Sequence, residues 1–91
     1  MATLYKTDGT REDVTPANGT DFKYDELKGF VEGYIEIVHL GKKKVMVVNE
    51  EGKLMNLPVN PEATKVMLEM LPMSRDYIVG NALVCKTSEI K

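Results

Sequence analysis

The most constraining feature of the sequence is the run over residues 33–59, GYIEIVHLGKKKVMVVNEEGKLMNLPV, which is its most apolar and most β-rich region. Residues 34–40 alternate between two faces, with β-branched and aromatic side chains at a period of two, which is typical of a strand that buries one face. Residues 44–48 (KVMVV) have no polar break after the lysine, which predicts a strand covered on both faces. Residues 53–57 predict a third strand that stops before a proline, because proline cannot donate a ladder hydrogen bond. The sequence therefore predicts a three-stranded meander over residues 34–57.

The segments on either side predict two helices and further strands. An Asp-Gly pair between two extended runs predicts an N-terminal hairpin over residues 2–14. A helical period with acids in its first turn predicts a helix over about residues 23–32. The triplet Asn60-Pro61-Glu62, an N-cap followed by proline and an acid, predicts a second helix over about residues 61–71. Residues 77–86 return to a strand pattern, with a turn or sharp bend at Gly80-Asn81.

This order of elements predicts one fold class. We expect an α+β fold in a single small domain of residues 1–91, with a mostly antiparallel sheet of five to seven short strands. Two short helices should cover the sheet, because an isolated small sheet is only marginally stable in water.

Composition narrows the class of protein further. The formal net charge is −2, with acids and bases mixed along the chain, so there is no broad basic face for phosphate backbones. No apolar run approaches the roughly 18–20 residues of a membrane helix, and the N-terminus lacks a signal-peptide pattern. The single cysteine, Cys85, excludes an internal disulfide and fits a reducing compartment. We therefore expect a cytoplasmic protein that does not bind membranes and has little affinity for nucleic acid.

Residues with catalytic chemistry are sparse. His39 and Cys85 are the only residues of their kinds, and a Cys–His nucleophile would need them adjacent in space. We interpret both as strand residues, and one histidine with one cysteine cannot supply a four-ligand metal site. The adjacent acids Glu50 and Glu51 fit a solvated turn. The sequence thus predicts no catalytic residue, no metal and no cofactor.

Asparagines and one lysine cluster are the candidate binding residues. An amide side chain both donates and accepts hydrogen bonds, which suits recognition of a nucleotide base or a peptide backbone. Asparagine is also favoured at turns and N-caps for local reasons. Three adjacent lysines could contact phosphate, although no aromatic residues alternate with them to stack on bases, and a solvated turn is the favoured interpretation. The candidates are Asn49, Asn56, Asn60 and Asn81 for a ligand, and Lys42, Lys43 and Lys44 for nucleic acid.

Four segments carry a resemblance when taken together and in order: GYIEIV, VMVVNEEGKL, LPVNPEAT and IVGNALV. They resemble a small uncharacterised family, a domain of unknown function found in phages and mobile elements, including those of gut bacteria. The resemblance runs over about residues 34–84. It implies an accessory protein of a phage or mobile element in the bacterial cytoplasm, and it transfers no catalytic residue.

Several functions stay open at this point. The first is a non-enzymatic module that acts by protein–protein interaction on a host or phage protein. The second is a protein that binds or sequesters a small ligand of the nucleotide type. A third is weak nucleic-acid contact through Lys42–Lys44. An enzyme is disfavoured because no constellation of titratable groups is visible. A homodimer is compatible with the sequence but not required by it.

Overall fold

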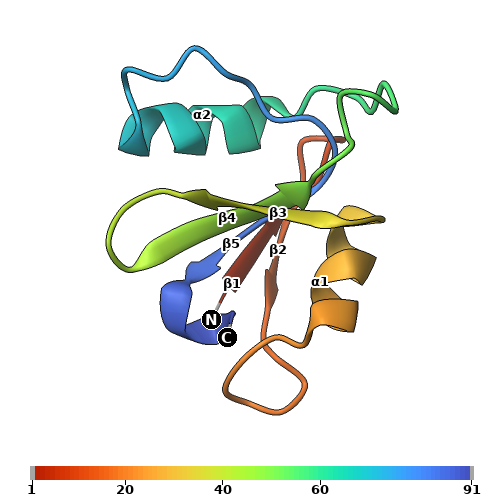
Figure 1. Cartoon of the computed structure of the whole chain (residues 1–91), viewed down its shortest axis with the longest axis vertical. Helices are drawn as coiled ribbons and strands as arrows, with labels where there is room; N and C mark the ends of the chain where they lie inside the picture. The colour runs from red at the N-terminus through yellow and green to blue at the C-terminus, as the bar shows by residue number, and fades with distance from the viewer. Residues whose placement is uncertain (1, 91) are drawn as a thin grey trace.

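The computed structural model describes residues 2–90, which form five strands, two α-helices and a short 3₁₀ helix (Figure 1). The elements are β1 (Ala2–Tyr5), β2 (Arg11–Val14), α1 (Tyr24–Val31), β3 (Ile35–His39), β4 (Lys44–Asn49), α2 (Pro61–Met70), β5 (Ala82–Lys86) and the 3₁₀ helix Thr87–Glu89. The predicted α+β class and antiparallel sheet are confirmed. Both helices lie within the ranges that the sequence predicts.

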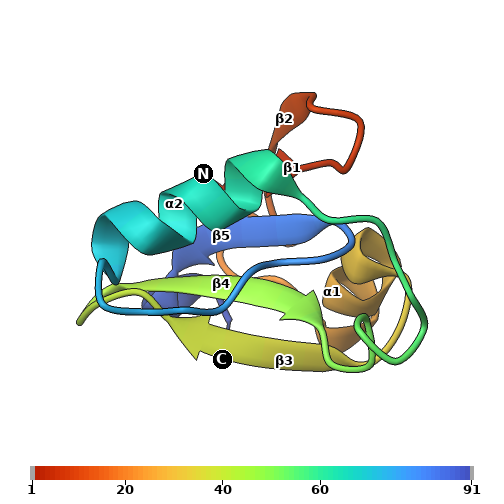
Figure 2. The ribbon, with the colours of Figure 1, turned by 90° about the horizontal axis from the view of Figure 1, so that it is seen from above.

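The five strands form one sheet in the order β2-β1-β5-β4-β3, and all neighbours are antiparallel. The last strand in the chain, β5, lies in the middle of the sheet between β1 and β4 (Figure 2). Val84 of β5 is level with Thr3 on one side and with Met46 on the other. The first and last strands are therefore neighbours, and the outer positions belong to β2 and β3.

The helices cover opposite faces of this sheet, with α1 on one side and α2 on the other (Figure 1). Successive side chains of β4 point to alternate faces. Val45 and Val47 pack on the α1 side with Leu27, whereas Met46 packs on the α2 side with Met67. Every apolar side chain of β4 is buried, as a strand covered on both faces requires. The domain therefore has two apolar layers, separated by the sheet.

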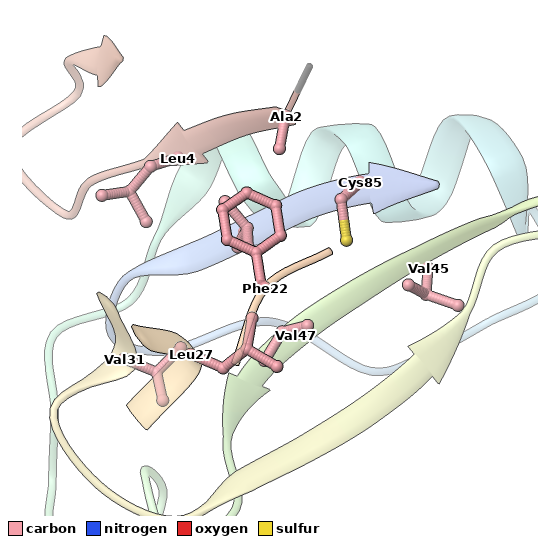
Figure 3. Packing of buried hydrophobic residues seen from close by; sticks show 9 residues of the cluster. Ala2, Leu4, Phe22, Leu27, Val31, Val45, Val47 and Cys85 are labelled. Carbon is pink, nitrogen blue, oxygen red and sulfur yellow. The ribbon is translucent and has the colours of Figure 1, made fainter. Parts of the chain in front are cut away.

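The layer under α1 is built around an aromatic residue. Side chains from β1, β4, β5 and α1 converge around Phe22, which lies just before α1 (Figure 3). Its ring meets Phe30 edge to face, with 5.7 Å between ring centroids. The helix itself begins after Lys23, whose backbone N–H donates to the Glu26 carboxylate at 2.9 Å. This packing fixes α1 against the centre of the sheet.

The predicted third strand of the meander is wrong. Residues 53–57 form a succession of turns, in which the Met55 N–H donates to the Glu51 carbonyl at 2.9 Å and the Leu57 N–H to the Gly52 carbonyl at 3.0 Å. Asn56 closes this loop with a φ of 53°. The segment is apolar but lacks a period of two, and its apolar side chains Leu54 and Met55 point to solvent. The strand prediction was wrong because it relied on the apolar residues of this segment, which do not alternate with polar ones.

Only part of the predicted strand region 77–86 is a strand. Val79 makes an isolated bridge with Val59, and Gly80 then bends the chain with a φ of 75° before β5 begins at Ala82. The end of α1 also differs from expectation. Glu32, and not Gly33, takes the left-handed conformation, with a φ of 62°.

Candidate functional site

Asn60 is a fully buried structural residue. Its side-chain oxygen accepts from the Ala63 N–H at 3.0 Å, which caps α2. Its amide group donates to the carbonyls of Tyr5 at 3.0 Å and Gly80 at 2.9 Å. The side chain thus joins the start of α2 to the end of β1 and to the bend before β5. All three hydrogen bonds of the Asn60 side chain are therefore made to backbone groups of the same protein.

Asn49 has a similar role at the end of β4. Its amide group donates to the Val31 carbonyl at 3.1 Å, and its oxygen accepts from the Glu51 N–H at 2.8 Å. It lies so close to Gly33 that a Cβ there would come within 2.7 Å of its amide nitrogen. Asn49 therefore connects the end of α1 to β4.

The other two predicted asparagines lie elsewhere. The Asn81 oxygen accepts from the Thr7 N–H at 3.2 Å, and Asn56 is exposed on the turn after β4. The four asparagines do not converge on one cavity, since Asn49 lines one pocket and Asn81 another. Within the described residues, no buried polar side-chain atom lacks a hydrogen-bond partner. Local structure thus accounts for Asn49, Asn60 and Asn81, and a ligand role for the asparagines stays a prediction.

The three candidate lysines lie at the β3–β4 turn and are exposed. Lys44 is level with Lys86 of β5, so a fourth cation lies beside the cluster. The sequence reasoning missed Lys86 because the two residues are far apart in the chain. No aromatic side chain is placed between these lysines by the strand register.

The imidazole and the thiol are not adjacent. The register places His39 beside Val45 and Val45 beside Cys85, so a valine separates them within one row across the sheet. Two strand spacings amount to roughly 9–10 Å. Burial raises the pKa of the Cys85 thiol to about 11, so it is a thiol at neutral pH. Among the described residues, no three histidine, cysteine or acidic side chains gather into a possible metal site.

Two small pockets border the loop that follows β4. One has a volume of about 120 Å³ and is lined by side chains that include Glu36, Lys53, Leu54 and Tyr77. The other, of about 170 Å³, is lined by residues that include Met55 and Asn81. Pockets that enclose drug-sized ligands have volumes of about 300–1,000 Å³, so these two are small for a nucleotide.

A third depression lies along the outer flank of α2. It is shallow and almost wholly apolar, and Val59 and Leu68 are exposed there. The Thr64 hydroxyl, one of its polar groups, already donates to the Asn60 carbonyl at 2.8 Å. It lacks the converging polar groups that orient a small ligand.

The most unusual surface is apolar and belongs to the loop that was predicted to be a strand. Leu54 is 85% exposed at its tip, beside the exposed Met55. Leu54 lines the first pocket together with Tyr77, over whose ring the Lys53 ammonium lies 4.3 Å from the centroid. We call Leu54, Met55 and Tyr77 the loop patch. Sequence reasoning missed it because Leu54 and Met55 were assigned to a strand.

The loop patch has a charged border. Lys53 forms an ion pair with Asp76, and this hydrogen bond lowers the pKa of the Asp76 carboxyl and raises that of the Lys53 ammonium. Glu36 and Glu50 add two further carboxylates around the first pocket. The border therefore carries more negative than positive charge.

The loop is held in a defined shape. The Gly80 N–H donates to the Pro58 carbonyl at 2.8 Å, and the Asn60 N–H to the Ile78 carbonyl at 2.7 Å. The Leu57 side chain packs against Gly80, where a Cβ would come within 2.9 Å of it. The exposed apolar side chains are thus displayed on an ordered support.

The fold and these sites define a small α+β domain with an antiparallel sheet between two helices. The chain belongs to the family described as domain of unknown function DUF3846, whose pattern matches residues 3–91. The family thus covers the N-terminal hairpin as well as the segments that carry the resemblance. No curated protein and no solved structure shows significant similarity to the chain. Among residues 2–90, no helix combines the length and apolarity needed to cross a bilayer.

Proposed function

We propose that this protein is a non-enzymatic interaction module that binds another protein through the loop patch. The observation that carries the proposal is the 85% exposure of Leu54 at the tip of a hydrogen-bonded loop. Exposed apolar side chains that gather on one surface are typical of protein–protein contact sites. Aromatic residues and methionine are enriched in such interfaces.

The partner surface should be complementary in shape and charge. Leu54 and Met55 project from the loop, which favours a partner with an apolar cleft. The acidic border around Tyr77 favours basic residues at the rim of that cleft, because opposite charges steer association. We infer that the partner is a host or phage protein, and that this protein is an accessory factor of a phage or mobile element in a bacterial cytoplasm. This origin rests on the resemblance of the four segments given above.

A photo-crosslinking residue at position 54 tests the proposal in cells that naturally carry the gene. The same residue at Met73, which is 92% exposed in the loop after α2, is the matched control. We expect position 54 to give a discrete crosslinked protein that position 73 does not give. The variant Leu54→Lys should lose capture of that protein, whereas Met73→Lys should retain it, with both variants melting close to the wild type.

The opposite results would contradict the proposal. If both positions crosslink the same proteins in the same ratio, the loop patch does not select a partner. If Leu54→Lys retains full capture, the contact lies on another surface.

A further inference from the structure

We propose that the outer edge of β3 pairs with β3 of a second copy, so that two sheets join into one across a two-fold axis. The inference goes beyond the proposed function, because it uses the backbone edge of β3 and not the loop patch. Either interaction can exist without the other.

The outer edge of β3 is open along its length. β3 is the last strand of the sheet and pairs only with β4 among the described strands (Figure 2). The helix on that face, α1, packs mainly over β4 and β5, so it does not cover the outer side of β3.

The register shows which backbone groups this edge presents. The Glu50 N–H donates to the Tyr34 carbonyl at 2.8 Å, and the Leu40 N–H to the Lys44 carbonyl at 3.0 Å. Hydrogen-bonded pairs alternate along an antiparallel ladder, so the even-numbered residues of β3 bond to β4. The N–H and C=O groups of Ile35, Ile37 and His39 therefore point outward and are available to another strand.

The two edges of the sheet differ in their protection against such pairing. Three of the four residues of β2 are charged: Arg11, Glu12 and Asp13. Charged side chains are a common device that discourages edge-to-edge association. β3 carries a single formal charge, Glu36, and otherwise has apolar residues and one histidine. Only the β3 edge is thus suited to accept a further strand.

A second copy of β3 matches this edge. With Ile37 opposite Ile37 of the second copy, Ile35 lies opposite His39, and every outward group finds a partner. This arrangement forms about six backbone hydrogen bonds, two for each hydrogen-bonded pair. Glu36 faces Val38 of the second copy, so the strands bring no like charges into direct opposition.

The partner that fits this edge is therefore a second molecule of the same chain, because its own β3 offers the same outward groups in a register that opposes no like charges.

Amide hydrogen exchange on the wild-type protein is the primary test. In a monomer the Ile37 N–H points to solvent and should exchange fast, whereas in the dimer it is bonded to the second copy. We expect protection at Ile37 that rises with protein concentration, together with dimers in sedimentation velocity. A protein that stays monomeric up to near-millimolar concentration, or an Ile37 amide whose exchange is independent of concentration, would overturn the proposal.

Matched proline variants locate the edge. His39→Pro removes one outward N–H from each copy, two hydrogen bonds per dimer, and should raise the dimer dissociation constant roughly tenfold. Asp13→Pro removes an outward N–H from the β2 edge and should leave dimerisation unchanged. If Asp13→Pro weakens the dimer and His39→Pro does not, the assignment to β3 is wrong.

In the crosslinking experiment at position 54, a product of twice the mass of the chain reports the dimer and a product of another mass reports a different partner, so the two proposals fail separately.

Discussion

Replacing Asn60 with alanine should destabilise the protein far more than the loss of a helix cap would. The side chain is 0% exposed and makes three hydrogen bonds, to Ala63, Tyr5 and Gly80. Loss of the cap costs about 1 kcal/mol. Each carbonyl that loses its buried donor adds about 1 kcal/mol at the lower end of the usual range. We therefore expect Asn60→Ala to lower the free energy of unfolding by about 3 kcal/mol.

This loss is large beside the total stability of such a domain. A chain of this length has a free energy of unfolding of roughly 5–14 kcal/mol. A loss of about 3 kcal/mol corresponds to a fall in Tm of roughly 12–24 °C. Urea unfolding followed by circular dichroism measures the effect as a shift in the midpoint with an unchanged slope.

Two control variants separate the contributions. Asn60→Asp keeps the size and the cap but turns carboxylate oxygens toward the carbonyls of Tyr5 and Gly80, so it should also be strongly destabilised at neutral pH. Asn56→Ala removes an exposed asparagine and should cost no more than about 1 kcal/mol. A cost below about 1 kcal/mol for Asn60→Ala, or wild-type stability for Asn60→Asp, would refute the argument that the amide donors join three segments.

Four further predictions concern the helix α1 and the thiol. Gly29→Ala should raise the free energy of unfolding by about 0.5–1 kcal/mol in urea melts, because Gly29 is within α1 and an added Cβ meets nothing within 4 Å. Glu32→Gly should stabilise by about 1 kcal/mol in the same assay, since Glu32 has a φ of 62°; unchanged stability would contradict this reasoning. Cys85 should resist thiol reagents at pH 8 until the protein unfolds, and labelling at the rate of an exposed cysteine would contradict its burial. Because the folded pKa of about 11 lies above the ordinary thiol value of 9.0, the thiol's contribution to stability should decline as pH rises through that interval, which pH-dependent urea melts would measure.

The sequence predicts correctly those elements whose conformation depends on residues adjacent in the chain. The helix start at Asn60 and Pro61 was readable because the cap, the proline and the following acid are adjacent in the chain. The burial of β4 on both faces followed from its unbroken apolar run. The turns at residues 53–57 were missed because apolar content alone does not distinguish a strand from an exposed loop. In those turns, backbone hydrogen bonds to Glu51 and Gly52 determine the conformation.

The candidate surfaces depend on contacts between distant segments. The loop patch brings Leu54 together with Tyr77, and the basic cluster gains Lys86 from another strand. The position of Asn60 as a cap was predicted, but its donation to Tyr5 required the pairing of β1 with β5. No periodicity within a segment indicates which strands become neighbours, so the strand order could not be derived.

The central position of β5 has a consequence for synthesis. During translation, the hairpin of β1 and β2 and that of β3 and β4 emerge first, and neither can complete a shared core until residues 82–86 leave the ribosome. Val45 and Leu4 must stay accessible to chaperones during that interval, since the β5 residues that lie beside them, Cys85 and Leu83, have not yet emerged. A nascent chain stalled before residue 82 should therefore remain protease-sensitive, and protection should be acquired late and in a single step.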